Sequence, residues 1–349
     1  ADLITEEEMV VTMSHGCYAK TQPLEAYQAQ RRGGKGKSAT AMKDEDFVEH
    51  LLVTNSHDTI LCFTNLGKVY WLRVFEIPQA SRASRGRPMV NILPLAEGER
   101  ISTILPVKEF DDQRCVFMAT ANGTVKKTRL SAFSRPRSSG LIALDIVEGD
   151  RLIGASLTNG DDDVMLVTSA GKAIRFNEQD VREMGRTARG VRGVKLDDVA
   201  KVISLMVPQE GGEVLTASEK GYGKKTAIAE FPLRGRGGMG VIAMQCTDRN
   251  GALAGAVQVF EGDDVMLISD LGTMVRTRTS EISSLGRNTQ GVRLIRVADE
   301  EKLIGLARIE EPEEGEHTLE EAERGQESSD TQAGSEAPLS DDAPESNDN

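Results

Sequence analysis

The sequence predicts an all-β, propeller-like disc of six blades, each a four-stranded sheet of about 50 residues. Three observations carry this prediction. An apolar segment, a turn glycine and a basic segment recur together at Gly67, Gly123, Gly171, Gly221 and Gly272, with spacings of 56, 48, 50 and 51 residues. A second column of glycines keeps step with the first, and a third apolar segment follows it in every repeat. Self-similarity at a fixed period indicates a repeat architecture.

The first repeat fits this frame if Cys17 occupies the turn-glycine position, 50 residues before Gly67. The segments on either side of each turn are five to eight residues long, rich in Val, Ile, Leu and Thr, and bounded by Gly, Asn and Asp. This composition is typical of β-strands. We therefore expect six hairpins, centred on turns near residues 17, 67, 123, 171, 221 and 272.

The second glycine column lies 19 residues after the first in five repeats and 17 residues after it in the third. Its members are Gly36, Gly86, Gly140, Gly190, Gly240 and Gly291. The third apolar segments begin near Val48, Ile101, Leu152, Val202, Leu253 and Leu303. Two hairpin strands, one strand after the second glycine and this third segment give four strands per repeat. No long apolar period of 3.6 residues occurs, so we expect little helix.

The ends of the chain favour a closed ring over an open row of sheets. The first hairpin has no third-type strand before it, and Leu303–Ile309 is such a strand with no hairpin after it. We therefore expect the C-terminal strand to complete the first blade and close the ring, which removes exposed sheet edges. The predicted domain spans residues 1–309.

Charge separates this body from a tail at residues 310–349. The chain has 42 Lys+Arg, 55 Asp+Glu and a net charge of −13. The tail holds 15 acidic residues and one base, which leaves 41 bases and 40 acids in the body. Because the tail has almost no large apolar residues, it is expected to be disordered. Two interpretations stay open: the tail keeps a basic surface soluble, or it competes with a polyanion for that surface.

Lys and Arg recur at equivalent positions of the repeats, after the turn and around the second glycine, so the symmetry predicts a belt of cations around one rim. Lys20 and Arg175 belong to these columns. The candidate DNA-binding residues among the others are Lys68, Arg85, Arg87, Lys126, Lys127, Arg135, Arg137, Lys172, Arg186, Arg189, Lys224, Lys225, Arg234, Arg236, Arg276, Arg278, Arg287 and Arg293. To them we add the segment Gln30, Arg31, Arg32, Gly33, Gly34, Lys35 and Gly36, a basic loop whose glycines let phosphates approach the backbone.

A curved belt of cations suits a bent duplex, because each Lys or Arg on a phosphate releases bound counterions. Aromatic residues make up only 4% of the chain, which argues against base stacking on single strands. No element resembles a reading helix, so we expect binding without sequence specificity.

The sequence offers little evidence for a disulfide framework, a metal site, a catalytic site or a membrane span. Four scattered cysteines with no CxxC pair argue against a disulfide framework or a zinc knuckle. The spacings of His15, His50 and His57 fit no common metal site, and Asp161–Asp163 lacks the spacing of a calcium loop. No catalytic triad or phosphate-binding motif occurs, so we expect no enzyme activity, metal or cofactor in this chain. No apolar run is long enough for a membrane span, and the start at Ala1 without a signal segment suggests a trimmed cytosolic fragment.

The segment QRRGGKG at residues 30–36 resembles the GyrA box, the signature of the A subunit (GyrA) of bacterial DNA gyrase. EEEMVVTMSH, FMATANGTVKK and EISSLGRNTQGV also resemble the C-terminal domain of that polypeptide, so the likeness covers residues 1 to about 309. The resemblance implies a six-bladed β-pinwheel that wraps DNA around its rim, with Gln30–Gly36 needed for wrapping. The sequence departs from the family at Cys17, where the family usually has glycine. No tyrosine in this chain matches the family's DNA-cleaving motif.

The resemblance further implies a place in a holoenzyme. The fragment, expected to be monomeric alone, would join the N-terminal region of GyrA and the GyrB polypeptide in an A2B2 assembly. That cytoplasmic, nucleoid-associated enzyme uses ATP and Mg elsewhere to introduce negative supercoils. Two alternatives stay open: the related domain of topoisomerase IV, which lacks an intact box, and a protein-interaction propeller. A hydrolase propeller would need carboxylates or histidines converging from several blades, and none recur.

Overall fold

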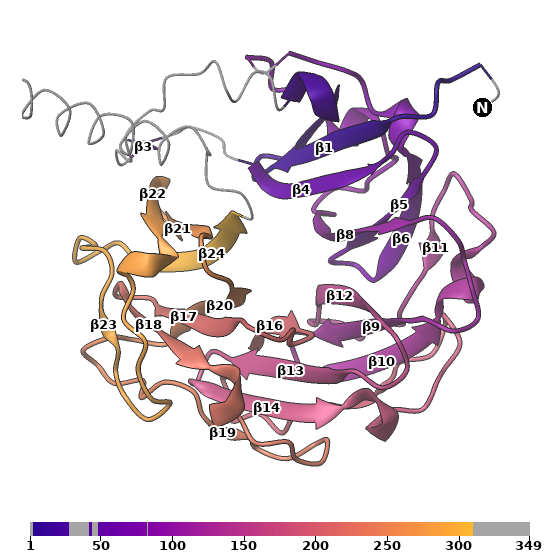
Figure 1. Cartoon of the computed structure of the whole chain (residues 1–349). Helices are drawn as coiled ribbons and strands as arrows, with labels where there is room; N and C mark the ends of the chain where they lie inside the picture. Colours follow the sequence, from indigo (N-terminus) through magenta and orange to yellow (C-terminus); the bar gives the residue numbers. More distant parts are fainter. Residues whose placement is uncertain (1–2, 28–41, 44–47, 82, 310–349) are drawn as a thin grey trace, which may run out of the picture.

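The described part of the chain forms six four-stranded antiparallel sheets arranged as the blades of a propeller (Figure 1). The structure, a computed structural model, describes residues 3–27, 42–43, 48–81 and 83–309. The six-bladed, all-β prediction is confirmed. The predicted tail at 310–349 and the segment Gln30–Gly36 lie outside the described residues.

Each blade is built around a hairpin. The first hairpin strands are β1 (Glu8–Ser14), β5 (Thr59–Thr64), β9 (Cys115–Thr120), β13 (Asp163–Thr168), β17 (Glu213–Ser218) and β21 (Asp264–Ser269). The second are β2 (Tyr18–Pro23), β6 (Lys68–Arg73), β10 (Thr124–Arg129), β14 (Lys172–Asn177), β18 (Tyr222–Ala227) and β22 (Thr273–Arg278). Short 3-10 turns follow the second strands of blades two to six: η1 (Val74–Glu76), η3 (Leu130–Phe133), η4 (Glu178–Asp180), η5 (Ile228–Glu230) and η6 (Thr279–Glu281).

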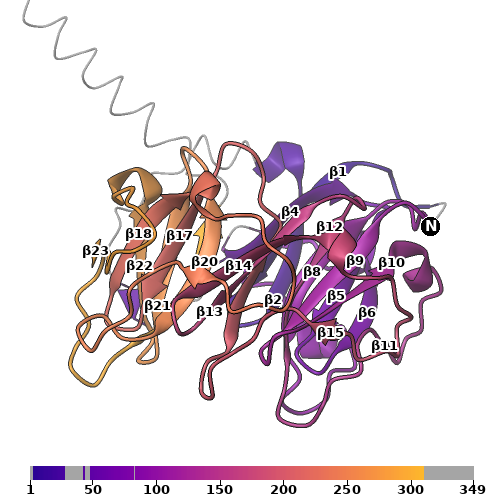
Figure 2. The same cartoon turned by 90° about the horizontal axis from the view of Figure 1, so that it is seen from below.

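The third apolar segments form the innermost strands, next to the centre of the ring in Figure 1. They are β4 (Val48–Asn55), β8 (Ile101–Val107), β12 (Leu152–Thr158), β16 (Val202–Met206), β20 (Leu253–Val259) and β24 (Leu303–Ile309). Each begins at or beside the residue expected from the sequence and pairs with the first strand of the hairpin that precedes it. In the view from below, the fourth blade (β13, β14) lies between blades five and six on one side and blades two and three on the other (Figure 2).

The outermost strand of each blade comes from the following repeat. These strands have two residues each: β7 (Arg87–Pro88), β11 (Leu141–Ile142), β15 (Val191–Arg192), β19 (Val241–Ile242) and β23 (Val292–Arg293). β7, which follows the hairpin and η1 of the second blade and leads into η2 (Met89–Asn91), pairs with β2 of the first blade. Each repeat therefore reaches back along the rim to its predecessor and ties the two blades together.

Ring closure corrects one expectation. β24 does not complete the first blade; it is the innermost strand of the sixth blade, where it pairs with β21. The sixth blade instead receives its outermost strand from the first repeat, as β3 (Met42–Lys43) pairs with β22. The closing device is thus the same backward exchange that joins every other pair of blades, carried by the first repeat rather than by the last strand.

Alternating apolar residues on the central strands pack neighbouring blades together. Phe117 of the third blade and Phe176 of the fourth are fully buried, with ring centroids 6.2 Å apart. Trp71 packs at the interface of blades two and three, where its Nε1 donates to the carbonyl of Phe133 at 2.7 Å. Cys62 and Cys115 are buried, as expected for small core residues. Apolar clusters of this kind join blades one to two, two to three, three to four, four to five and five to six.

The placement of Cys17 in the turn column is confirmed by its backbone. Cys17 has φ 63°, in the left-handed region that the turn glycines also occupy, for example Gly171 at φ 82°. Its carbonyl accepts the Met89 amide at 2.9 Å, as the Gly171 carbonyl accepts the Ala243 amide at 2.7 Å. At Gly171 a Cβ would collide with the Met244 carbonyl, whereas the Cys17 side chain packs against the first apolar cluster.

Candidate nucleic-acid interface

Five rim segments connect the 3-10 turns to the outermost strands and form the outer wall of the wheel. They are residues 77–86 apart from 82, 134–140, 181–190, 231–240 and 282–291. Each runs beside the second hairpin strand of the preceding blade, as parallel bridges such as Lys127–Glu183 and Arg175–Leu233 show. The strands that end these segments, β11, β19 and β23, lie at the perimeter in Figure 1.

The second glycines allow this close approach. Gly190 has φ 96°, and a Cβ there would collide with the Val125 carbonyl of the strand that it crosses. Because only glycine fits, the chain crosses directly onto the neighbouring blade, and the side chains before it face outward. The sequence pattern of Arg beside Gly follows from this crossing.

Most predicted cations of the rim segments and outermost strands are exposed. Arg186 and Arg287 are half-exposed. Their guanidinium groups donate to the carbonyls of Ile142 and Ile242 on the preceding blades, at 3.4 and 2.9 Å. The exposed members are Arg85, Arg87, Arg135, Arg137, Arg189, Arg234, Arg236 and Arg293.

The predicted cations after the turns are placed differently. Lys126 and Lys224 are fully buried and Lys127 is 6% exposed. Lys127 donates to the carbonyl of Glu178 at 3.0 Å and lies 3.6 Å from its buried carboxylate. The expectation that these three lysines contact phosphate does not fit their burial, because an ammonium enclosed by protein has no route to a ligand in this conformation.

Four further cations of this column are at least partly engaged. Lys225 lies 3.8 Å from Glu213, Arg276 donates to Asp264 at 2.7 Å, and Lys68 donates to the carbonyl of Ser139 at 3.3 Å. Arg175 pairs with Asp163 at 2.9 Å and also donates to the carbonyls of η5 and its C-cap. Lys172 and Arg278 are half-exposed. The column after the turn thus mainly holds blades together, whereas the rim segments carry the exposed charge.

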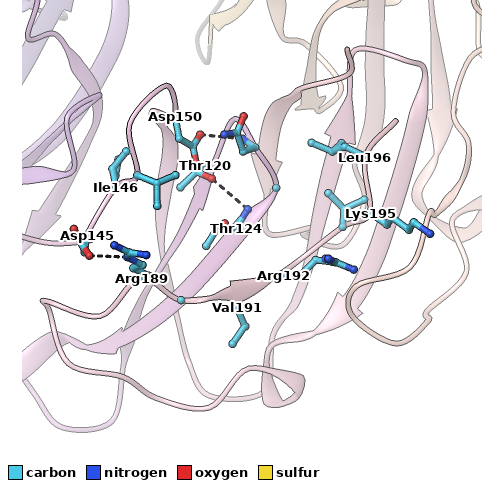
Figure 3. A pocket seen from close by; sticks show the side chains of 15 residues that line it. Thr120, Thr124, Asp145, Ile146, Asp150, Arg189, Val191, Arg192, Lys195 and Leu196 are labelled. Atoms are coloured by element: carbon cyan, nitrogen blue, oxygen red, sulfur yellow. Dashed lines mark hydrogen bonds and ion pairs between the residues drawn. The ribbon is translucent and has the colours of Figure 1, made fainter. Parts of the chain in front are cut away.

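Sequence reasoning missed two exposed cations of the rim, Arg192 and Lys195. Arg192 stands two residues after Gly190, the same offset as Arg293 after Gly291, so the glycine column would have found it. Together with Arg189 they line a pocket of about 530 Å³ beside the third hairpin turn (Figure 3). Its acidic members include Asp145, toward which Arg189 points at 2.9 Å.

A second cationic group lies on the fifth blade. Arg249 and Arg293 both stack over the Tyr222 ring, at 5.1 and 5.2 Å from its centroid. Arg293 also donates to the Tyr222 hydroxyl at 2.8 Å, and this hydrogen bond lowers the pKa of Tyr222 from its ordinary value. The ring fixes the direction of both arginines, which reduces the side-chain entropy lost when they bind an anion.

The chain passes from the first blade to the sixth between two described strands. β2 ends in the first blade at Pro23, and β3 lies on the sixth blade. The predicted segment Gln30–Gly36 falls between these two strands in the sequence, outside the described residues.

The described residues show no group of three or more His, Cys, Asp or Glu side chains that could hold a metal ion. Over the same part of the chain, no helix is long and apolar enough to cross a membrane.

Comparison with known proteins agrees with this architecture. The model of the DNA gyrase C-terminal domain, beta-propeller, matches residues 8–55, 58–108, 116–159, 162–209, 212–259 and 263–310, one match per hairpin and inner strand. A solved C-terminal domain of DNA topoisomerase IV superposes with a TM-score of 0.77 at 26% identity, covering 93% of this chain and 99% of that chain. A DNA gyrase A C-terminal domain gives 0.66 at 26% identity, covering 87% and 100%.

The curated relatives are DNA gyrase GyrA polypeptides. That of Pseudomonas aeruginosa is 56% identical over 372 aligned positions, covering 94% of this chain and 40% of the relative. That of Escherichia coli is 56% identical over 311 positions, covering 89% and 36%. The chain thus spans two fifths or less of these relatives. With six repeats matched in register and identity above half, the chain belongs to the DNA gyrase C-terminal domain family.

Proposed function

We propose that this chain binds duplex DNA on its rim and bends it around the wheel, as the wrapping domain of a DNA gyrase GyrA polypeptide. The observation that carries the proposal is the exposure of arginines on the outermost segments of successive blades, from Arg85 in the first blade to Arg293 in the fifth. A smooth bend of 40–90° over 20–30 base pairs costs about 1–6 kcal/mol, which many dispersed phosphate contacts can offset.

In the complete enzyme, the wrapped DNA would return a segment of the same molecule for strand passage with one crossing sign. That role places the chain beside the N-terminal region of GyrA and the GyrB polypeptide in an A2B2 assembly on the cytoplasmic nucleoid. The ATP and Mg of the supercoiling reaction belong to those other parts. The fragment itself would be a monomer that bends DNA without cutting it.

Two observations favour gyrase over topoisomerase IV. The curated relatives at 50–58% identity are gyrase GyrA polypeptides, and the sequence QRRGGKG at residues 30–36 is intact. A protein-interaction propeller is less well supported, because a flat-face binding site does not require arginines repeated along the perimeter.

The test is the topology of a relaxed plasmid closed by ligase in the presence of the chain. Wrapping by the rim shifts the linking number of the closed products in one direction, in proportion to bound protein. Binding should also weaken steeply with salt, with a slope of about −0.9 per phosphate contact in a plot of log K against log salt. Salt-insensitive binding and an unshifted linking number would together favour the protein-interaction alternative.

A variant of the exposed rim links the assay to the site. Replacing Arg135, Arg137, Arg234 and Arg236 by Ala removes four exposed cations from two blades, and we expect the salt slope to fall by up to about four. A control for the loss of any two cations replaces Arg114 and Arg151, which lie outside the rim segments, and is compared with the pair Arg135 and Arg137 alone. Equal wrapping by the two variants contradicts the rim assignment.

A further inference from the structure

The rim segments are of two alternating kinds. The third residue of the second hairpin strand is Lys20, Lys126 and Lys224 in blades one, three and five. In blades two, four and six it is Tyr70, Ile174 and Val275. Because this side chain faces the rim segment that crosses its blade, the five described segments, over blades one to five, lie in turn over a lysine and over an uncharged side chain.

The buried lysines hold their segments in the same way. The Lys126 ammonium donates to the carbonyls of Gly185, Arg186 and Ala188 at 2.9, 2.6 and 3.1 Å. The Lys224 ammonium donates to the corresponding carbonyls of Gly286, Arg287 and Thr289 at 2.7, 2.5 and 3.2 Å. In the first blade the half-buried Lys20 donates to Ser81 and Ser84, the first and third of these positions. The arrangement thus recurs at a two-blade interval.

Drawing these carbonyls inward turns amides outward. In a planar trans peptide the C=O of one residue and the N–H of the next point in opposite directions. The amides that face away from Lys126 are therefore those of Arg186, Thr187 and Arg189, and those that face away from Lys224 belong to Arg287, Asn288 and Gln290. Within the described residues, none of these six amides donates a hydrogen bond to a protein acceptor.

The glycine-rich segment of the fifth repeat differs at one of these positions. There the Gly237 amide, which corresponds to that of Thr187, donates to the Gly193 carbonyl at 2.9 Å. The amides of Arg236 and Met239 donate to no protein acceptor within the described residues. Segments 185–190 and 286–291 are therefore distinguished by the full set of three open amides together with the buried ammonium behind them.

We propose that segments 185–190 and 286–291 are binding loops for the backbone phosphates of duplex DNA, each offering three outward amides with a buried positive charge behind them. Successive N–H groups form concavities that bind anions. An arginine in each loop, Arg186 or Arg287, adds charge at the edge. This inference rests on the proposed function and names the contacts through which two of the blades would hold the duplex.

The neighbouring charges set the two loops apart. Beside the first loop, the Asp145 carboxylate accepts from Arg189 Nε at 2.9 Å, and its backbone amide donates to the Ala188 carbonyl. The equivalent residue beside the second loop is Gln245, whose amide donates to Thr289 in the same way. Glu230 is the acidic group facing Lys224. Because Gln245 carries no charge, the second loop has less acidity at its outer edge.

The test removes an amide without removing a charge. Thr187→Pro and Asn288→Pro delete one outward N–H each, and the matched controls Thr187→Ala and Asn288→Ala shorten the same side chains while keeping the amide. Affinity for a short duplex of mixed sequence is measured across a salt series. We expect each Pro variant to bind about tenfold more weakly than its Ala control. The salt slope should stay unchanged, since an amide releases no counterion, whereas Arg137→Ala should lower the slope by about one.

Two outcomes overturn the inference and a third concerns the proposed function. Equal affinities of the Pro and Ala variants show that the amides do not contact phosphate. If a Pro variant unfolds, the unmodified chain is titrated with inorganic phosphate, and the amide NMR signals of Arg186, Thr187 and Arg189 must move; constant signals again contradict the inference. Absence of salt-dependent duplex binding by the unmodified chain overturns the proposed function itself.

Discussion

The junction between the sixth and first blades differs from the five other junctions in what holds it. Apolar clusters with fully buried residues such as Phe117 join the consecutive blades. Among the described residues, no such cluster joins blade six to blade one. There the inner strands β24 and β4 contact each other, yet Val53 and Ile304 on them are 47% and 52% exposed.

This difference shows how a ring of repeats can be closed with little burial. At the central junctions apolar contact and strand exchange act together, whereas at the last junction the exchange of β3 onto β22 acts with little apolar support. Burial contributes about 25 cal/mol per Å² of apolar surface, so among the described residues the last junction gains the least stabilisation from burial.

The largest expected effect is at a central junction. Phe117→Ala should lower the free energy of unfolding by about 3–5 kcal/mol, because it leaves a cavity among packed side chains. Ile304→Ala at the last junction should change it by less than about 0.5 kcal/mol, since the side chain is half-exposed. Denaturant unfolding monitored by circular dichroism measures both, and similar losses would show that the two junctions are equally packed.

The next largest effect on stability is expected in the first turn column, where Gly171 and Cys17 occupy equivalent positions. Gly171→Ala should cost about 2 kcal/mol or more, because alanine is strained at φ 82° and its Cβ meets the Met244 carbonyl. Cys17→Gly should stay within about 1 kcal/mol of the unmodified protein, since relief of strain at φ 63° opposes the loss of packing. Thermal unfolding measures the stability of both variants. A large loss of stability in Cys17→Gly would mean that the Cys17 side chain, rather than its backbone, maintains the first hairpin.

The buried lysines of blades three and five predict a pH effect. Burial, together with the charge of Arg186, lowers the pKa of Lys126 from 10.5 to about 8, and Asp145 opposes this shift. Burial likewise lowers the pKa of Lys224 to about 8; Arg287 lowers it further, while Glu230 and Cys246 raise it. Between pH 8 and the ordinary lysine pKa the unfolded chain therefore binds more protons, so the free energy of unfolding should rise with pH.

Lys126→Met and Lys224→Met test the sign of this effect. Each replaces a titrating group with an uncharged one of similar length, so the rise in unfolding free energy through this window should become smaller than in the unmodified protein. Tyr222, whose pKa is lowered, titrates equally in all of these chains and cancels in the comparison. An unchanged pH profile would mean that the two ammonium groups titrate as they do in water.

The smallest effect on stability is expected at the closing strand. Proline at both Met42 and Lys43 removes whichever amide of β3 donates to β22, and we expect a loss in the free energy of unfolding below about 1 kcal/mol because only two residues of β3 pair with β22. Alanine at both positions retains the amides and serves as the control. Small-angle scattering should show a larger radius of gyration for the proline variant, and an unchanged radius would show that the last junction stays closed without β3.

Much of this architecture could be predicted from local sequence. The number of repeats and the positions of their strands followed from strand length, the two glycine columns and the third apolar segments. These signals are local because each tight turn and each crossing requires a particular residue type at one position. Cys17 was placed correctly for the same reason, although it is not glycine. Arg192 was missed although the column that contains Arg293 points to it.

What the sequence by itself determined is therefore the repeat, its strands and the bias of positive charge toward two columns. Only the tertiary structure decided which cations face water: Lys126 and Lys224 belong to the same basic pattern as exposed arginines, yet they are enclosed by the segment that crosses them. It also decided that β3 rather than β24 closes the ring. Burial and strand exchange depend on residues that are distant in the chain. Local composition therefore does not indicate which segment will cover a given side chain.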